Sequence, residues 1–254
     1  MNEMFGTILR GIYNMVGNYG MSIVVFTLIT KVILLPLSIK QTKTTKITQA
    51  LQPKIAEIQR KYPHDKEKQN EETMKLYQKY NFNPLGGCLP VLIQLPIIIA
   101  LFGVMREPTK YVFTEAEFAA VDQSFIWIVN LTSTALDVIK ESGFSVTSIM
   151  ACVLPLVNFG ATFIQQKMTP GQDNNQAGGM NAFMKFMPFL IGYTAFTFSQ
   201  SLSLYWACST LMGMAQTVLL NKIVNVEIKV EETPKRESLV SHKAKTDDRR
   251  GGRR

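Results

Sequence analysis

Residues that build metal and redox sites are scarce in this chain of 254 residues. It has two histidines and three cysteines, and Cys88, Cys152 and Cys208 lack metal-ligand spacing. We expect all three cysteines to be reduced packing residues. No glycine-rich loop followed by Lys-Ser or Lys-Thr is present, so no nucleotide site is predicted. The sequence therefore predicts a protein that is not an enzyme, with no catalytic residue, metal or cofactor.

Acidic residues are absent from the long apolar segments, which excludes an intramembrane carboxylate relay. The uncharged runs are 11–30, 32–39, 85–105, 143–166 and 186–221. Most of the charge lies in residues 40–80 and 222–254, and the formal net charge is +8. The chain thus alternates apolar and ionic blocks, which is unlike the mixed composition of a basic soluble domain.

The uncharged runs have the length of membrane-spanning helices. A helix needs about 20 apolar residues to cross a hydrocarbon core, at a rise of about 1.5 Å per residue. The sequence therefore predicts an all-α polytopic membrane protein with five transmembrane helices. Their expected positions are about 21–40, 85–105, 145–165, 182–198 and 202–221. The last two share one uncharged run, and the polar residues Ser199-Gln200-Ser201 divide it into a tight helical hairpin.

The distribution of lysine and arginine predicts the orientation of these helices. Five spans place three segments on one side of the membrane: the connections 40–83 and 166–185 and the tail from residue 222. These segments hold 22 of the 27 lysines and arginines. Since cytosolic connections are rich in Lys and Arg, we expect the N-terminus outside and the C-terminus in the cytosol. The acidic loop 106–144 is then external, and its apolar part 125–139 is expected at the outer interface.

The segments around the 21–222 core have distinct patterns. Residues 1–20 carry apolar side chains at helical spacing and predict an external interfacial amphipathic helix, with a disordered leader as the alternative. They lack the pattern of a secretory signal or transit peptide. Residues 42–82 predict a cytosolic helical hairpin with a break at Pro63, or else a solvated basic loop. Residues 223–254 predict a disordered basic tail.

Lys31 interrupts an otherwise uncharged segment, 21–39, near its middle. A lysine at the centre of a membrane helix costs about 2.5–3.5 kcal/mol on insertion scales, so it is a candidate functional residue. Snorkelling is the alternative, but Lys31 lies nine residues from Lys40, roughly 13 Å by helix rise. That distance exceeds the comfortable reach of the side chain.

Polar residues in the other spans are expected to surround Lys31. Thr27 lies one turn earlier on the same helix face. Other polar side chains are spaced so that they run from mid-span toward the cytosolic end: Gln94, Asn158, Thr162, Gln165, Ser209 and Gln216. Each alone is better explained as an interhelical hydrogen-bonding residue. Together, with no intramembrane carboxylate to pair Lys31, they predict a wet groove open to the cytosol.

Two segments carry a resemblance to a known family. The segments 83-NPLGGCLPVLIQLPIIIALF-102 and 204-LYWACSTLMGMAQ-216 resemble spans of the YidC/Oxa-type membrane protein insertases. Two further features resemble the same family and follow its order along the chain. They are the first span, with its cation and Leu-Leu-Pro-Leu, and the charged hairpin after it. The resemblance covers about residues 5–222, and the compact start is similar to the short forms of Gram-positive-type bacteria.

The resemblance implies a five-helix insertase in a bacterial plasma membrane. Its groove would receive the hydrophilic segment of a nascent membrane protein while the apolar segment moves into lipid. Matched by position, Lys31 takes the place of the groove cation, Thr27 that of a groove threonine, and Trp206 that of a substrate-contacting aromatic residue. The family usually has arginine where this chain has Lys31, and lysine lacks the planar fork that binds a carboxylate through two hydrogen bonds.

The predicted function is therefore that of a membrane protein insertase or chaperone that acts alone or with the Sec translocon. The expected partners are nascent membrane proteins, anionic lipids and the ribosome, which the basic tail and the cytosolic hairpin would contact. A tail that only fixes topology is an equally good interpretation. The alternatives for the whole chain are a small solute or anion transporter or channel with Lys31 as its binding site, and a structural assembly factor.

Overall fold

The helices of this chain follow its apolar runs. The computed structural model describes residues 1–80, 82, 89–168 and 178–224, with the side chains of 89–93 and 178–185 left out. The described part consists of helices and connections and contains no strand, which confirms the all-α prediction. Cys88, the motif residues 83–88, residues 169–177 of the 166–185 connection and the tail beyond Val224 lie outside the described residues.

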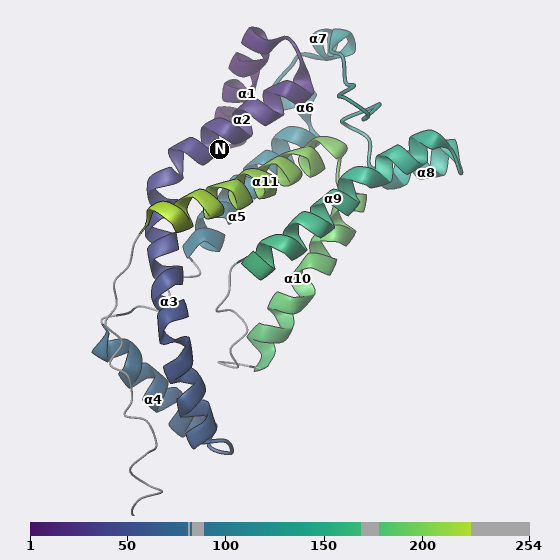
Figure 1. Ribbon diagram of the computed structural model, residues 1–254. Helices are drawn as coiled ribbons and strands as arrows, with labels where there is room; N and C mark the ends of the chain where they lie inside the picture. Colours follow the sequence, from purple (N-terminus) through teal and green to yellow (C-terminus); the bar gives the residue numbers. More distant parts are fainter. Residues whose placement is uncertain (81, 83–88, 169–177, 225–254) are drawn as a thin grey trace, which may run out of the picture.

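Five apolar helices form the main bundle (Figure 1). They are α2 (Tyr19–Ile33), α5 (Leu89–Arg106), α9 (Val146–Met168), α10 (Gly178–Thr197) and α11 (Gln200–Ile223). The α10–α11 break falls at Phe198 and Ser199, where the polar residues predict it. Helix α11 packs against α9 and α2, and α10 packs against α9.

Length and composition alone give fewer membrane crossings than the five predicted. Among the described residues, α9 is the one helix long and apolar enough to span a bilayer, and α1 with α2 passes only as a pair bent by 119°. The described apolar parts of α5 and α10 are shorter, at Gln94–Arg106 and Phe186–Thr197. The five-span count therefore stays a prediction.

Helix α1 (Asn2–Val16) is amphipathic and packs on α2 and α5. Its buried face includes Leu9 and Ile12. Gly17, at φ 73°, ends α1 in the left-handed conformation that glycine adopts most readily. The Asn18 side chain then accepts a hydrogen bond of 2.9 Å from the Met21 N–H and caps α2. This turn separates Tyr19, which the sequence pattern assigned to the first helix, from α1.

The α2–α3 junction differs from the expected one. The sequence predicts a span over 21–40 and a new helix from 42, whereas α2 ends at Ile33 and α3 (Leu35–Lys61) runs through both segments. Leu34 alone separates the two helices, and it keeps helical hydrogen bonds to Thr30 and from Ser38. Pro36 lies in the first turn of α3, where its missing N–H is tolerated. The helical path therefore continues from the bundle into the charged connection, and it changes direction between α2 and α3 (Figure 1).

Helices α3 and α4 (Lys66–Lys79) form a pair that projects from the bundle (Figure 1). Asp65 begins α4 by accepting a hydrogen bond of 2.9 Å from the Lys68 N–H. The contact between the helices centres on a small buried cluster of Leu51, Ile55 and Tyr77. Because so little apolar surface is buried there, we expect the pair to be less stable than the bundle.

The opposite end of the bundle is covered by α1 and by residues 107–142, and we call it the capped end. The covering segment contains the short helices α6 (Pro108–Tyr111), α7 (Glu115–Ala120) and α8 (Ala135–Ser142). Residues 131–133 satisfy the first N–H groups of α11, since the Leu131 and Ser133 carbonyls accept hydrogen bonds of 2.7 and 2.9 Å from Ser201 and Gln200. The segment is thereby fixed to the start of α11.

Packing is uneven along the bundle. The main buried cluster lies at the capped end, where it joins α1, the starts of α2 and α11, the end of α5 and the covering segment. The last buried residue of α2 is Thr27, and that of α9 is Ala161. In α11 no residue between Thr210 and Leu220 is buried. The first buried residue in the described part of α5 is Ala100. The half nearer α3, which we call the α3 end, is therefore loosely packed.

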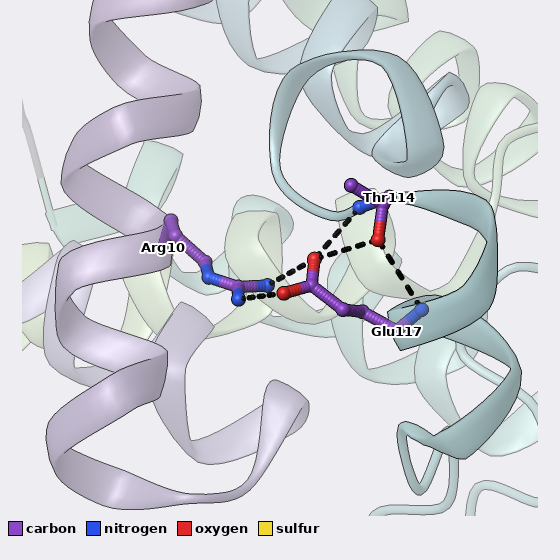
Figure 2. A network of polar contacts seen from close by, with 3 residues as sticks. All are labelled: Arg10, Thr114 and Glu117. Atoms are coloured by element: carbon purple, nitrogen blue, oxygen red, sulfur yellow. Dashed lines mark hydrogen bonds and ion pairs between the residues drawn. The ribbon is translucent and has the colours of Figure 1, made fainter.

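An ion pair fixes α1 to the covering segment (Figure 2). The Arg10 guanidinium donates to both Glu117 carboxylate oxygens, with Nη1 3.1 Å from Oε2, and it lies 5.0 Å from the centre of the Phe113 ring. Thr114 and Glu117 form a capping box at the start of α7. The hydrogen bond from the Thr114 N–H, then those from Arg10 and the Thr114 hydroxyl, lower the Glu117 pKa from 4.5 to about 2.

We predict that Glu117→Gln lowers the melting temperature of the purified protein by a few degrees at pH 7. A carboxylate whose pKa is lowered by folding stabilises the folded state. This contribution to the free energy of unfolding is fully present above the unfolded-state pKa and is lost as pH falls through the folded-state pKa. The difference between wild type and variant should therefore shrink between about pH 4.5 and pH 2. Thermal unfolding in detergent across this range measures it. Glu115→Gln, in the same helix, is the control, and an equal, pH-independent loss in both variants would contradict the prediction.

Candidate functional site

Lys31 lies in the last turn of α2, at the α3 end of the bundle. Its side chain is half-buried, and among the described residues it has no hydrogen bond or ion pair. The partial negative charge at the end of a helix favours a cation there, but it supplies no direct partner. An ammonium group in this position must be solvated by water or by a ligand.

Gly213 on α11 brings the heads of Lys31 and Gln165 together. A Cβ atom built on Gly213 would lie 3.6 Å from the Lys31 Nζ and 3.1 Å from the Gln165 Nε2. Lys31 comes from α2 and Gln165 from α9, so the polar groups of two helices converge on the surface of a third. The structure thus brings together two predicted site residues that are distant in sequence, and the missing side chain of Gly213 leaves room for both.

Gln94 and Ser209 meet at a residue that was not among the predicted site residues. The Gln94 Nε2 donates a hydrogen bond of 3.0 Å to the Tyr205 hydroxyl and so links α5 to α11. Ser209, one turn after Tyr205, interacts with the same hydroxyl group. Tyr205 belongs to the motif 204-LYWACSTLMGMAQ-216 and precedes Trp206, so its hydroxyl is the feature of the sequence that points to this contact.

Thr27 and Asn158 are buried in helix contacts. Thr27 is 1% exposed, and its hydroxyl donates to the Ile23 carbonyl of its own helix at 2.7 Å. The Asn158 side chain is fully buried, and its Nδ2 donates to the Ser203 carbonyl at 3.0 Å, which joins α9 to α11. Both residues lie at the border between the packed and the loosely packed halves. Their contacts are those of hydrogen-bonding residues within the bundle.

Several buried polar atoms along the same helices have no hydrogen-bond partner. Among the described residues, those nearest the α3 end are the Asn158 Oδ1, the Thr162 Oγ1 and the Gln216 Nε2. Unpaired polar atoms in an apolar surrounding are costly, and bound water commonly satisfies them. Their position on α9 and α11 continues the polar line from Asn158 toward Gln165 and the α3 end. The line is chemically suited to hold water or the polar groups of another chain.

Trp206 is half-buried on α11. Successive helical residues point about 100° apart, so Trp206 faces away from the direction in which Tyr205 meets Gln94. The cluster therefore comprises Lys31, Gln165 and Gly213 at its centre, with Gln94, Tyr205 and Ser209 as a second group. A hollow of about 470 Å³ lies elsewhere, between Asn18, Met21 and residues 122–126, and none of the predicted site residues lines it.

The described residues form an all-helical bundle that presents polar groups and Lys31 at its loosely packed end. The chain belongs to the family of the 60Kd inner membrane protein, whose family model matches residues 11–227. This finding confirms the resemblance drawn from the sequence motifs. The relatives are bacterial inner membrane proteins.

Two similar relatives match most of their own length. Membrane protein insertase YidC of Fusobacterium nucleatum subsp. nucleatum is 37% identical over 207 residues, which cover 82% of this chain and 88% of the relative. The protein of the same name from Oceanobacillus iheyensis is 34% identical over 227 residues, which cover 85% and 79%.

A solved structure has a similar fold. It is described as the active YidC insertase crystal structure with the first transmembrane domain resolved. The TM-score is 0.60 at 25% sequence identity, and the match covers 88% of this chain and 46% of the solved one. The Nitratidesulfovibrio vulgaris YidC is likewise matched over 36% of its length. Longer members of the family therefore contain a region similar to this chain.

We predict effects of different size for two substitutions on α9. Asn158→Ala removes a buried interhelical hydrogen bond and should lower the free energy of unfolding by about 1–3 kcal/mol. Thr162→Val removes a hydroxyl that has no partner and should change it by less than about 0.5 kcal/mol. Reversible unfolding in mixed micelles provides the measurement. A loss in Thr162→Val as large as that in Asn158→Ala would show that the hydroxyl has a partner.

Proposed function

We propose that this chain is a membrane protein insertase. In this proposal, the hydrophilic segment of a nascent membrane protein enters a polar groove around Lys31 from the cytosol. The adjoining apolar segment then moves into the bilayer along α9 and α11. The family and the names of its relatives support the insertase function, and the groove is the mechanism that the described residues of this chain suggest.

The observation that carries the proposal is the uneven packing of the bundle around Lys31. Burial ends at Thr27, Ala161 and Thr210, and the polar cluster begins where burial ends. A hydrophilic segment within a bilayer loses contact with water, and polar groups in that position lower the cost. The capped end is tightly packed, which fits a groove that is closed on the outside and accessible from the α3 end.

The charge pattern supports the orientation that the mechanism needs. The α3–α4 pair and the tail hold most of the lysines and arginines, so the α3 end of the bundle is assigned to the cytosol. The N-terminus and the capped end are then external, and the protein is multi-pass in a bacterial plasma membrane. Ribosomes, anionic lipids and the Sec translocon are the partners proposed for the basic surfaces.

The driving force is expected to come from the substrate itself. Transfer of apolar surface from water to lipid yields roughly 25 cal/mol per Å². Summed over the surface of a whole apolar segment, this free energy is expected to exceed the cost of moving a short polar segment. The sequence offers no nucleotide-binding motif. The insertase would therefore act as a chaperone that lowers the barrier for the polar segment and performs no chemical reaction.

A small solute or anion transporter is the alternative, and the unpartnered ammonium of Lys31 is the observation that favours it. Transporters are commonly built from two repeated halves with discontinuous helices, and the described helices do not divide in this way. Liposomes containing the purified protein separate the two functions. An insertase integrates a one- or two-span protein without nucleotide, whereas a transporter moves anions across the same vesicles.

We predict that Lys31→Ala lowers insertion of a substrate with an acidic external tail by roughly tenfold, because the ammonium group no longer attracts carboxylates where the local dielectric is low. Lys31→Arg should retain most of the activity. Protease protection of the substrate in liposomes measures insertion. Lys43→Met, which removes an exposed cation of α3, is the control. Full activity of Lys31→Ala would remove Lys31 from the mechanism.

We also predict that Gly213→Leu impairs insertion severalfold, because its side chain would occupy the space in which the Lys31 and Gln165 heads converge. Gly160→Leu is the matched control, since a Cβ atom on this glycine of α9 would meet nothing within 4 Å. Both variants should be extracted as folded protein and compared in the same insertion assay. Equal activity of the two variants would contradict a role for the space at Gly213.

A further inference from the structure

Lys46 connects the charged α3–α4 pair to the end of α11. Its Nζ donates hydrogen bonds of 2.8 Å to the Asn221 carbonyl and 2.6 Å to the Val224 carbonyl. Both acceptors belong to the last turn of α11, which ends at Ile223 with Val224 as its C-cap. Lys46 and its two acceptors are separated by 175 and 178 positions along the chain. This is therefore a tertiary contact. Lys46 differs in this respect from an exposed lysine such as Lys43.

The end of a helix is a favourable place for such a contact. The last four carbonyl groups of a helix have no partner within it, and they carry a partial negative charge. A lysine that reaches them satisfies two of these groups and interacts with the helix dipole. Val224 is 7% exposed, so its carbonyl lies at a partly buried position where a charged donor is worth more than in water.

The position of Lys46 relates this contact to the proposed groove. Lys31 precedes Lys46 by 15 residues on the helical path from α2 into α3, at most roughly 22 Å by helix rise. On α11, Gly213 and Gln216 lie one to three turns before the carbonyls that Lys46 binds. Side-chain burial is sparse in this part of α2 and α11. A tie at the far end of both helices can therefore determine how far apart they stand.

We propose that Lys46 is a positioning residue that holds the cytosolic end of α11 against α3 and so sets the opening of the groove. Through this tie, movement of the α3–α4 pair is transmitted to α11. A partner that binds the pair, such as a ribosome, would then change the access of the substrate to Lys31. The inference deepens the proposed function and rests on it.

The test measures the position of α11 relative to α3 separately from activity. Spin labels are placed at Lys61→Cys and Leu219→Cys, two exposed positions at the end of α3 and on α11, after alanine replaces the native cysteines. Double electron–electron resonance of the full chain in liposomes gives the distance distribution between the labels. The variants are Lys46→Met, Lys46→Arg and the control Lys43→Met, which removes an exposed cation one turn away.

We expect Lys46→Met to broaden the distance distribution and to lower insertion by roughly tenfold or more, because methionine makes neither of the two hydrogen bonds from the ammonium group. Lys46→Arg, whose guanidinium can donate to both carbonyls, should restore both quantities, and Lys43→Met should match wild type. A distribution in Lys46→Met equal to that in Lys43→Met would overturn the proposal, whatever the activity.

Two further results are decisive. If Lys46→Met fails to fold, the milder Lys46→Gln must show the broader distribution with an unchanged melting temperature, and a narrow distribution there overturns the proposal. If wild type itself inserts no substrate, the proposed function fails, while the distance measurement still shows whether Lys46 positions α11.

Discussion

The solvation of one ammonium group is the constraint on which the arrangement of this bundle depends. Lys31 is placed among apolar residues, and the apolar runs of the sequence contain no carboxylate that could neutralise it. A lysine in a tightly packed apolar core would carry a large desolvation penalty. The bundle reduces this penalty because close packing ends before the lysine is reached and leaves its side chain only half-buried. At Gly213 the absence of a side chain leaves space at the lysine head, and Gln165 contributes a polar group there.

The capped end compensates for this loose packing. A membrane bundle with half of its length poorly packed must gain its stability elsewhere. Here the large buried side chains of α1, α2, α5 and α11 gather at the capped end. The hydrogen bonds from Ser201 and Gln200 to residues 131–133 and the Arg10–Glu117 ion pair fix the covering segment there. Rigidity at one end thus permits open spacing at the other, and the same helices serve both purposes.

Helix positions could be predicted from the sequence because charge and apolar residues are segregated. The break between α10 and α11 followed from Ser199 to Ser201, and the start of α4 followed from Pro63 and Asp65. The continuity of α2 into α3 could not be predicted, since Lys40 marks the end of an apolar run but not of a helix. Where apolar residues give way to charged ones, the surroundings of a helix change from lipid to water, but its backbone hydrogen bonds can continue unchanged.

The candidate site could be predicted only in part. Lys31 is conspicuous because a charge in an apolar run is rare, and Gln165 follows from helical spacing. The roles of Tyr205 and Gly213 depend on how helices rotate against one another, which spacing along one helix does not determine. Asn158 illustrates the same limit, because its spacing with Thr162 and Gln165 is regular, yet its side chain is bonded to the α11 backbone.

Lys46 shows that a cation in a basic connection can have a structural role besides topology. By charge count it is one of many lysines on the side that the sequence predicts to be cytosolic, and the sequence offers no feature that separates it from Lys43. The difference arises from the continuity of α2 and α3, which fixes the direction of every α3 side chain relative to the bundle. Since α3 follows α2 after a single residue, the helical path that carries Lys31 is held through Lys46 to the end of α11. Any force on the α3–α4 pair therefore acts on both sides of the proposed groove at once.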